Sequence, residues 1–331
     1  MINFDKLYFH GRFKIDNDLI YFYNTASGIE FNFTGKKIII IMKANEGQKS
    51  KVWMKAIIDD DYDNSYDLVP SLEFSKFSIE LKDNNHNVKI LKASEAIEST
   101  VVVSDLMIDG KYLDKPVYDK TFLVIGDSTV AAYGNLGKLT DEKTLMDTDG
   151  LSSFAYLAAR YFKASLNALT ASGWGVVFSP WTTPNRISIV SYIDKMAPFS
   201  TDFYDLKKVN PNVIIISLGT NDYEYYILSQ SKDEKDKLIN ELSLHYHKML
   251  DMLNNYYKDV PIFMVYGVMG EEGNYEVMKK IYEENKDKYN LHLSFLLGDR
   301  SGVSYHPTKA SHLEMSQTLI NELKKVLSWM K

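Results

Sequence analysis

Four short motifs in this chain contain the residue types needed to hydrolyse an ester. In order along the sequence they are Gly126-Asp127-Ser128, Ser172-Gly173, Gly219-Thr220-Asn221-Asp222 and His306-Pro307. A serine hydroxyl attacks an ester at neutral pH only when a base takes its proton, and the resulting oxyanion needs hydrogen-bond donors around it. The four motifs offer a candidate for each of these roles.

Ser128 is the candidate nucleophile. It follows an apolar run at residues 122–125 and precedes small residues at 130–132. This pattern predicts the carboxyl end of a parallel strand, the edge where open α/β sheets bind ligands. Gly126 permits a sharp turn there, and a serine that begins a helix has a free backbone N–H. Taken alone, the tripeptide would favour a simple turn with a helix-capping serine.

Two further motifs offer oxyanion donors. Asn221 follows the apolar run at residues 213–218, so its side-chain amide is expected at the same sheet edge as Ser128. The alternative for Asn221 is an Asx turn. Gly173 lies in a glycine-rich segment that lets a backbone N–H approach a ligand closely. We predict its N–H as the second donor, with that of Gly175 as the alternative.

His306 is the candidate base. It precedes a long amphipathic stretch, and Pro307 suits the first turn of the helix expected there. This junction would place the imidazole at the ligand-binding edge, within reach of Ser128. The alternative is a helix-capping or surface histidine, which is the interpretation we favour for the other C-terminal candidates, His245, His247 and His312.

The first third of the chain is predicted to consist of β-strands. Short apolar or alternating runs occur at residues 29–33, 52–54, 77–81, 88–91 and 101–103. Turn-forming residues separate them at Thr34-Gly35, Asn45-Glu46-Gly47, Asn84-Asn85 and Asp109-Gly110. The acidic run at residues 59–63 is typical of a solvated hairpin tip. We therefore expect an all-β sandwich.

From about residue 120 onward, apolar runs alternate with amphipathic stretches. The runs are residues 122–125, 213–218, 262–268 and 291–297, with a weaker one at 164–169, and the stretches are 151–162, 235–257, 275–289 and 308–330. This alternation implies a parallel sheet with helices on both faces. We predict a β-sandwich over residues 1–115 and a three-layer α/β/α domain over residues 116–331, a division that the length of 331 residues also favours.

Composition excludes several function classes. The 38 basic and 44 acidic residues give a net charge of −6 without long blocks of one sign, which disfavours nucleic acid as a partner. The absence of cysteine rules out a disulfide framework or a thiolate metal site. No apolar stretch approaches the roughly 20 residues that span a bilayer, so no membrane partner is expected. The N-terminus lacks a secretory signal, so we expect a cytoplasmic protein unless such a signal has been removed.

The order of the four motifs strongly resembles the SGNH (GDSL-type) hydrolase superfamily. The resemblance implies that Ser128 is the nucleophile and His306 the general base and acid. It also implies an oxyanion hole made by the N–H groups of Ser128 and Gly173 and the side-chain amide of Asn221. Neither a metal nor a cofactor is expected.

The resemblance narrows when the N-terminal segments are included. Residues 8–12 (Tyr-Phe-His-Gly-Arg), 27–35 and 123–129 are similar to the corresponding segments of family 2 carbohydrate esterases. Those enzymes pair a jelly-roll domain with an SGNH domain and remove acetyl groups from plant polysaccharides. The likeness covers essentially the whole chain. It implies an acetylated oligosaccharide or polysaccharide of the xylan or mannan type as the substrate.

One feature departs from the common SGNH pattern. A carboxylate usually lies two or three residues before the catalytic histidine, but Ser304 and Val303 occupy these positions. Such a carboxylate holds the imidazole in the correct tautomer. Some family 2 carbohydrate esterases resemble this chain in using a Ser–His dyad held by a main-chain carbonyl. We expect a carbonyl near residues 303–304 to hold His306, with Asp299 as the weaker alternative.

Aromatic residues near the motifs could bind a sugar, because the flat C–H faces of sugar rings pack on aromatic rings. Tyr305 directly precedes His306, Trp174 lies inside the glycine-rich segment, and Trp181 follows it. For each of them ordinary core packing is the alternative. Tyr223, Tyr225 and Tyr226 are further candidates.

The sequence thus favours a carbohydrate O-acetyl esterase with an acyl-serine mechanism. Two alternatives stay open. One is an SGNH esterase for another acyl ester, such as a bacterial glycan, a lipid or a thioester. The other is a carbohydrate-binding protein that has lost activity, because the orienting carboxylate is absent.

Overall fold

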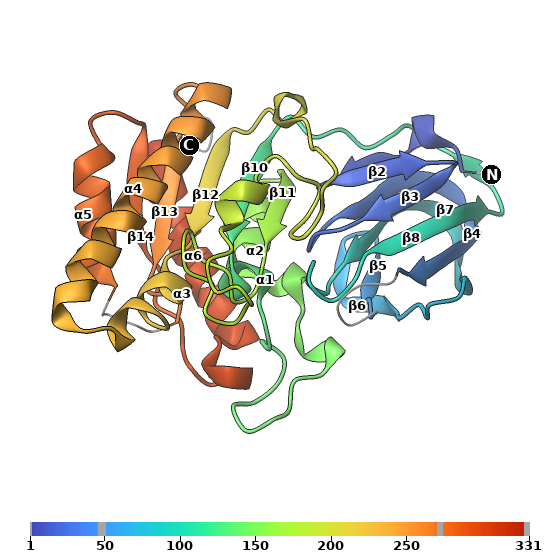
Figure 1. Ribbon diagram of the computed structural model, residues 1–331. Helices are drawn as coiled ribbons and strands as arrows, with labels where there is room; N and C mark the ends of the chain where they lie inside the picture. The colour runs from blue at the N-terminus through green and yellow to red at the C-terminus, as the bar shows by residue number, and fades with distance from the viewer. Residues whose placement is uncertain (1, 46–50, 270–273, 328–331) are drawn as a thin grey trace.

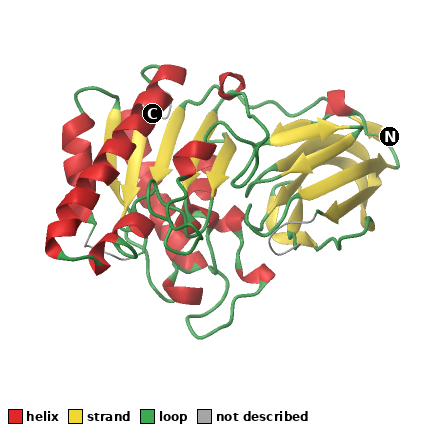
Figure 2. Ribbon diagram, viewed as in Figure 1, coloured by secondary structure: helices red, strands yellow, loops and turns green. Residues whose placement is uncertain are grey.

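The computed structural model describes residues 2–45, 51–269 and 274–327 and contains two sheets of different kinds (Figure 1). Nine strands in the first part of the described chain form an antiparallel sheet, and five in the second part form a parallel sheet with helices on both faces (Figure 2). We call the two parts the N-terminal and C-terminal domains. The predicted combination of an all-β domain and an α/β domain is confirmed. The boundary between residues 115 and 116 stays a prediction, since it lies in a stretch that belongs to neither sheet.

The N-terminal sheet has the order β2-β3-β8-β4-β7-β5-β6, with β1 and β9 also paired to β4. Its strands are β1 (Tyr8–His10), β2 (Phe13–Asp16), β3 (Leu19–Phe22), β4 (Gly28–Ala44), β5 (Met54–Ile58), β6 (Asp61–Leu68), β7 (Ser75–Lys92), β8 (Val101–Ile108) and β9 (Lys111–Tyr112). Alternate residues of β4 point into the core, where Ile29, Phe31 and Phe33 are fully buried.

Two of the predicted turns in this domain were wrong. Thr34-Gly35 lies inside β4, and Asn84-Asn85 lies opposite it inside β7, paired as Thr34↔Asn85 and Gly35↔Asn84. Both strands continue past these residues, and the pairing changes register between Gly35 and Lys37. The turns at Asp109-Gly110 and at the acidic hairpin tip, which joins β5 to β6, are confirmed. The turn predicted at Asn45-Glu46-Gly47 falls mostly outside the described residues.

The C-terminal sheet has the order β11-β10-β12-β13-β14, with every pair parallel. Its strands are β10 (Thr121–Gly126), β11 (Ser165–Thr170), β12 (Val213–Ser217), β13 (Ile262–Tyr266) and β14 (Leu291–Phe295), and the helices are α1 (Ser128–Ala131), α2 (Phe154–Tyr161), α3 (Thr220–Tyr223), α4 (Lys232–Tyr256), α5 (Tyr275–Asn285) and α6 (Lys309–Val326). Successive strand residues serve opposite faces: Leu123 and Ile125 pack with α4 and α5, while Phe122 and Val124 pack with α2 and α6. Both faces are therefore buried, which explains the nearly continuous apolar strands.

Buried contacts join the two domains. Trp53 and Leu91 of the N-terminal domain belong to the same apolar core as α2 and α6. The fully buried Arg12 donates from Nε to Asn167 Oδ1 at 3.3 Å and from Nη1 to the carbonyl of Lys195. Its guanidinium also lies 4.6 Å from the ring centre of Tyr204. A buried cation is tolerated only with such partners, so Arg12 fixes the N-terminal domain against the C-terminal one.

Candidate active site

The sheet order brings three of the four motifs to one edge. Ser128 begins α1 directly after β10, and the two neighbours of β10 are β11 and β12. Gly173 follows β11, and Asn221 follows β12 at the start of α3. The carboxyl ends of these parallel strands lie together at the lower edge of the sheet in Figure 1. The structure thus places Ser128 between the two segments predicted to supply oxyanion donors.

His306 reaches this edge by a longer route. It follows β14, at the end of the sheet, and the segment between them is held by backbone hydrogen bonds to the loop that follows α1. The amide of Val303 donates to the carbonyl of Gly134 at 3.2 Å. His306 Nε2 lies 2.8 Å from Ser128 Oγ, although the two residues are 178 positions apart. The predicted proximity of these two residues is therefore observed.

The other ring nitrogen of His306 faces two main-chain carbonyls. Nδ1 lies 3.1 Å from the oxygen of Ser304 and 3.2 Å from that of Val303. A carbonyl only accepts, so Nδ1 carries the proton, and Nε2 is left to accept the Ser128 hydroxyl proton. This is the tautomer that a general base requires. Asp299, the alternative partner, instead accepts the amide and the hydroxyl of Thr308 at the start of α6.

Unusual backbone geometry positions these carbonyls. Ser304 (φ 53°) and Tyr305 (φ 63°) both adopt the left-handed conformation directly before His306. For residues other than glycine this conformation costs on the order of 1–3 kcal/mol each and often occurs at functional sites. The backbone thereby folds back so that the Ser304 carbonyl faces the imidazole two residues later.

The surroundings keep His306 neutral. Burial, which disfavours the charged imidazolium, lowers its pKa to about 4, and the positive charge of Lys143 acts in the same direction. The carbonyl partners oppose the shift without cancelling it. At neutral pH the imidazole is thus ready to accept a proton.

We therefore predict that kcat/KM stays high well below the ordinary histidine pKa of about 6.5. A lowered pKa means that activity is retained as the pH falls through 6 and is lost only as the imidazole becomes protonated near pH 4. Burial raises the pKa of Asp127 to about 6, so this carboxyl also titrates in the range. A pH profile combined with NMR titration of the His306 ring separates the two groups. A ring pKa at or above 6.5 would contradict the prediction.

Two backbone amides are available for an oxyanion. Neither the Ser128 N–H nor the Gly173 N–H donates to an acceptor within the described part of the chain. Gly173 has φ +79° in a turn closed by the Trp174 amide and the Ala171 carbonyl at 3.1 Å. A Cβ there would approach the Trp181 ring at 3.0 Å, so the position suits glycine. The alternative donor, Gly175, already donates to Ser179 Oγ at 3.1 Å.

The Asn221 side chain lies at the same edge of the sheet as these amides, and its own amide group already makes two hydrogen bonds. Nδ2 donates to the carbonyl of Trp174 at 3.0 Å and to Asp127 Oδ2 at 3.1 Å. Both amide protons thus have acceptors. To stabilise an oxyanion as well, Asn221 must share one of these protons with the substrate. The next residue, Asp222, accepts the backbone amides of residues 176–178 and fixes the segment after Gly175.

The dyad opens into a cavity of about 1190 Å³. Four exposed aromatic side chains lie on its lining: Trp181 at 69%, Tyr305 at 53%, Phe199 at 44% and Tyr225 at 37%. Tyr225 lies edge-on to Trp181 at 5.7 Å. These rings offer faces on which a sugar can pack.

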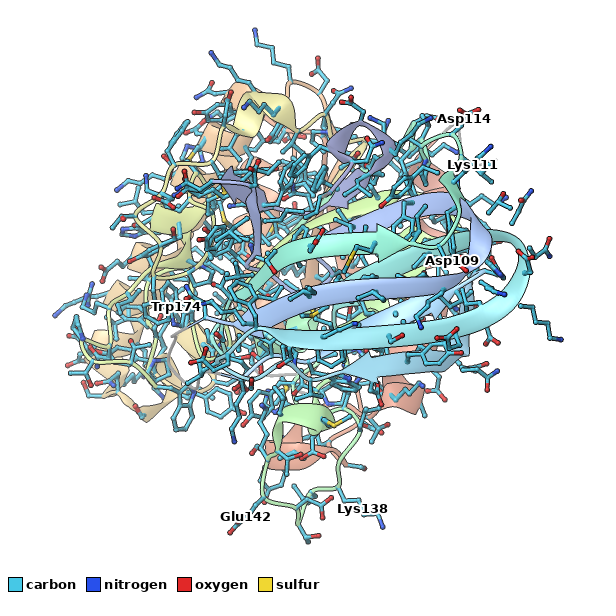
Figure 3. The ribbon with its side chains drawn as sticks, turned by 90° about the vertical axis from the view of Figure 1, so that its right-hand side faces the viewer. Asp109, Lys111, Asp114, Lys138, Glu142 and Trp174 are labelled. Carbon is cyan, nitrogen blue, oxygen red and sulfur yellow. The ribbon has the colours of Figure 1, made fainter. Side chains whose placement is uncertain are left out.

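Trp174 differs from Trp181 and Tyr305 in how little of its side chain is exposed. Its side chain is only 1% exposed and packs edge-on against Phe199 at 4.5 Å and Tyr192 at 5.2 Å. In Figure 3 the loop that carries Lys138 and Glu142 projects at the bottom of the molecule, away from the labelled Trp174. Trp174 is nevertheless among the residues that line the cavity, so its contact with a sugar stays a prediction. Its carbonyl accepts a hydrogen bond from the Asn221 amide.

Three histidines lie away from this chemistry. His245 and His247 bond within or near α4, to the Glu241 carbonyl and to Asp251 respectively. His312 is fully buried and accepts the amide of Phe154 at the start of α2, at 3.2 Å. His312 thus caps a helix as predicted, although that helix is α2 and the imidazole is not on the surface.

Several cavity residues escaped the sequence analysis. The ring centre of Tyr133 lies 4.6 Å from that of His306, with the two planes tilted by 40°, and Ile97 reaches the cavity from the N-terminal domain. Both lie in loops whose sequence has no periodicity or motif, so no signal pointed to them. Among the residues described, no group of three or more His, Cys, Asp or Glu side chains could hold a metal, and no helix is both long and apolar enough to cross a bilayer.

Comparison with known families agrees with this geometry. Residues 122–323 match the family described as GDSL-like Lipase/Acylhydrolase. The chain belongs to this family. Residues 9–116 match a second family, described as Carbohydrate esterase 2 N-terminal. The predicted resemblance to SGNH hydrolases, and among them to family 2 carbohydrate esterases, is confirmed.

Individual proteins that are similar to this chain are also described as esterases. Cellulase/esterase CelE of Acetivibrio thermocellus is 27% identical over 320 residues, which cover 92% of this chain and 37% of that protein. Acetylxylan esterase / glucomannan deacetylase of Cellvibrio japonicus is 28% identical over 186 residues, or 54% of this chain and 49% of that protein. The chain thus spans between a third and a half of these relatives. A solved family two carbohydrate esterase from Clostridium thermocellum, in complex with cellohexaose, has the same fold, with a TM-score of 0.86, 24% identity and coverage of 98% and 99% of the two chains.

Proposed function

We propose that this protein is a carbohydrate O-acetyl esterase that cleaves acetyl esters of xylan-type or mannan-type glycans through Ser128 and His306. The observation that carries the proposal is the 2.8 Å contact between Ser128 Oγ and a neutral His306, at the base of a cavity with exposed aromatic rings. The printed names of the relatives, an acetylxylan esterase and glucomannan deacetylase among them, support the choice of substrate. The cellohexaose complex of a protein with this fold supports a β-linked sugar chain as the ligand.

In the proposed acylation step, His306 Nε2 takes the proton of Ser128 as Oγ bonds to the acetyl carbon. The carbonyl oxygen becomes an oxyanion, which the N–H groups of Ser128 and Gly173 stabilise together with the shared Asn221 amide. The intermediate then collapses, the bond to the sugar oxygen breaks, and His306 returns the proton to that oxygen. The products are the free sugar hydroxyl and an acetyl-serine.

Deacylation repeats the sequence with water. His306 takes a proton from the water molecule as its oxygen bonds to the acetyl carbon, and it then returns the proton to Ser128 Oγ as acetate leaves. The carbonyls of Val303 and Ser304 hold Nδ1–H in both steps. In place of a carboxylate, only their partial charges stabilise the imidazolium.

The experiment that tests this function measures acetate released from acetylated xylo- and manno-oligosaccharides beside p-nitrophenyl acetate. We expect release from at least one of the glycans, and the values of kcat/KM then rank the sugars. Activity on p-nitrophenyl acetate alone would point to another acyl ester. No release from any substrate would favour a carbohydrate-binding protein without activity.

Replacement of Trp181 by alanine is predicted to raise KM for acetylated oligosaccharides by about fivefold, because an aromatic contact contributes on the order of 1 kcal/mol. The kcat for p-nitrophenyl acetate should stay within twofold of native, since this substrate has no sugar to stack. The matched control is Phe203→Ala, which removes another exposed ring that does not line the cavity. Equal losses on both substrates would show that Trp181 instead supports the adjacent Gly173.

A further inference from the structure

A loop of the N-terminal domain reaches the active site of the C-terminal domain. It follows β7 and contains Glu95 and Glu98, both almost completely buried, and Ile97, which lines the cavity. The fully buried Lys92 donates from Nζ to the carbonyls of Ser94, at 3.2 Å, and of Glu95. These two hydrogen bonds from Lys92 hold the backbone that carries Glu95 in place.

The Glu95 carboxylate contacts the turn that contains the candidate oxyanion donor. Its Oε2 accepts a hydrogen bond from Ser172 Oγ, across the domain boundary. Ser172 is the second residue of the turn closed by Ala171 and Trp174. The peptide unit between Ser172 and Gly173 bears the Gly173 N–H. A hydrogen bond that fixes the Ser172 side chain therefore restricts rotation of the plane in which this donor lies.

The same cluster extends to the histidine side of the site. Lys143 Nζ lies 2.7 Å from Glu98 Oε1 and 3.8 Å from Glu95 Oε1, and the two glutamates are buried while Lys143 is partly exposed. The ammonium also lies 4.7 Å from the ring centre of Tyr133, whose ring packs on His306. Lys143 thus lies beside both carboxylates. A hydrogen bond from a hydroxyl to a carboxylate is stronger than one between two neutral groups, so the contact between Ser172 and Glu95 is a strong one.

We propose that Glu95 is a positioning residue of the active site, supplied by the N-terminal domain, whose hydrogen bond to Ser172 holds the Gly173 N–H in place for the oxyanion. The proposal rests on the proposed function. It gives the N-terminal domain a catalytic contribution besides its part of the cavity wall. Because Glu95 acts through Ser172, removal of either partner should have the same effect.

The test is a double-mutant cycle on p-nitrophenyl acetate. We expect Ser172→Ala and Glu95→Ala each to lower kcat by about tenfold with KM within twofold of native, because an oxyanion donor acts in the transition state. The double variant should be no slower than either single one. Glu95→Gln should recover most of the activity, since its amide oxygen still accepts the hydroxyl. Glu80→Gln, an exposed glutamate of the same domain, is the matched control.

Native kcat in Ser172→Ala would overturn the proposal, and this variant loses only one hydroxyl, so the test stands even if Glu95→Ala unfolds. Independent losses that multiply in the double variant would also overturn it. The rate at which a fluorophosphonate labels Ser128 tests the Ser128 nucleophile separately from the role of Glu95, because labelling needs no sugar. A native chain that is not labelled would refute the Ser128 chemistry itself. Equal labelling of the native chain and Ser172→Ala would refute only the role of Glu95.

Discussion

Replacement of Ser128 by alanine is expected to lower kcat for acetate release by at least about three orders of magnitude. The substitution removes the hydroxyl that His306 Nε2 contacts at 2.8 Å. Ser172 and Ser304 also line the cavity, but the Ser172 hydroxyl is committed to Glu95, and Ser304 faces the imidazole through its carbonyl. Neither of these serine hydroxyls is therefore placed to replace Ser128 Oγ beside Nε2.

The affinity of the Ser128→Ala variant for glycans should be unchanged, because Trp181 and Tyr305 remain. Isothermal titration with an unreactive oligosaccharide would measure this affinity, and acetate release would measure turnover. Ser78→Ala, at an exposed position of β7, is the control for the effect of losing a serine hydroxyl. Residual turnover above about one per cent of native would mean that another group attacks the ester. Loss of glycan affinity together with turnover would mean that the substitution disturbs the cavity as a whole.

The site could be predicted to the extent that regular structure positions it. Ser128 and Asn221 follow apolar parallel strands, and the carboxyl ends of neighbouring parallel strands meet at one edge of a sheet. A carbonyl partner for His306 could also be predicted, because the sequence offers no carboxylate at residues 303 and 304. The structure shows this partner. The left-handed conformation of Ser304 that presents this carbonyl could not be predicted, since neither Ser304 nor Tyr305 is a residue type that favours it.

The features that could not be predicted from the sequence mostly depend on side-chain exposure and on contacts between distant residues. Trp174 and Trp181 look equivalent in the sequence, and both line the cavity, yet the side chain of Trp174 is 1% exposed and that of Trp181 is 69% exposed. The contact between Glu95 and Ser172 joins two domains over 77 positions. Thr34 and Gly35, a pair that is typical of a turn, instead pair with β7 and let β4 continue. In each case the tertiary environment decided between two locally reasonable outcomes.

Replacement of His306 by alanine is expected to lower kcat by about three orders of magnitude, because the Ser128 proton then has no acceptor in the site. A dyad held by a carbonyl also predicts that two nearby substitutions should have little effect on kcat. Ser304→Ala keeps the carbonyl that holds Nδ1, and kcat should stay within about threefold of native. Asp299→Asn should lower the melting temperature by weakening the cap of α6, with kcat of the folded fraction nearly unchanged.

These three variants together test the carbonyl as the partner of His306. Steady-state kinetics on p-nitrophenyl acetate, with the melting temperature of each variant, separates loss of catalysis from loss of folded protein. A large fall of kcat in Ser304→Ala would show that the serine side chain takes part and would rule out the carbonyl as sufficient. A comparable fall in folded Asp299→Asn would instead show that Asp299 reaches the imidazole during turnover. If both variants keep nearly native kcat while His306→Ala is inactive, the base works without a carboxylate, and the left-handed residues before it perform the orienting role.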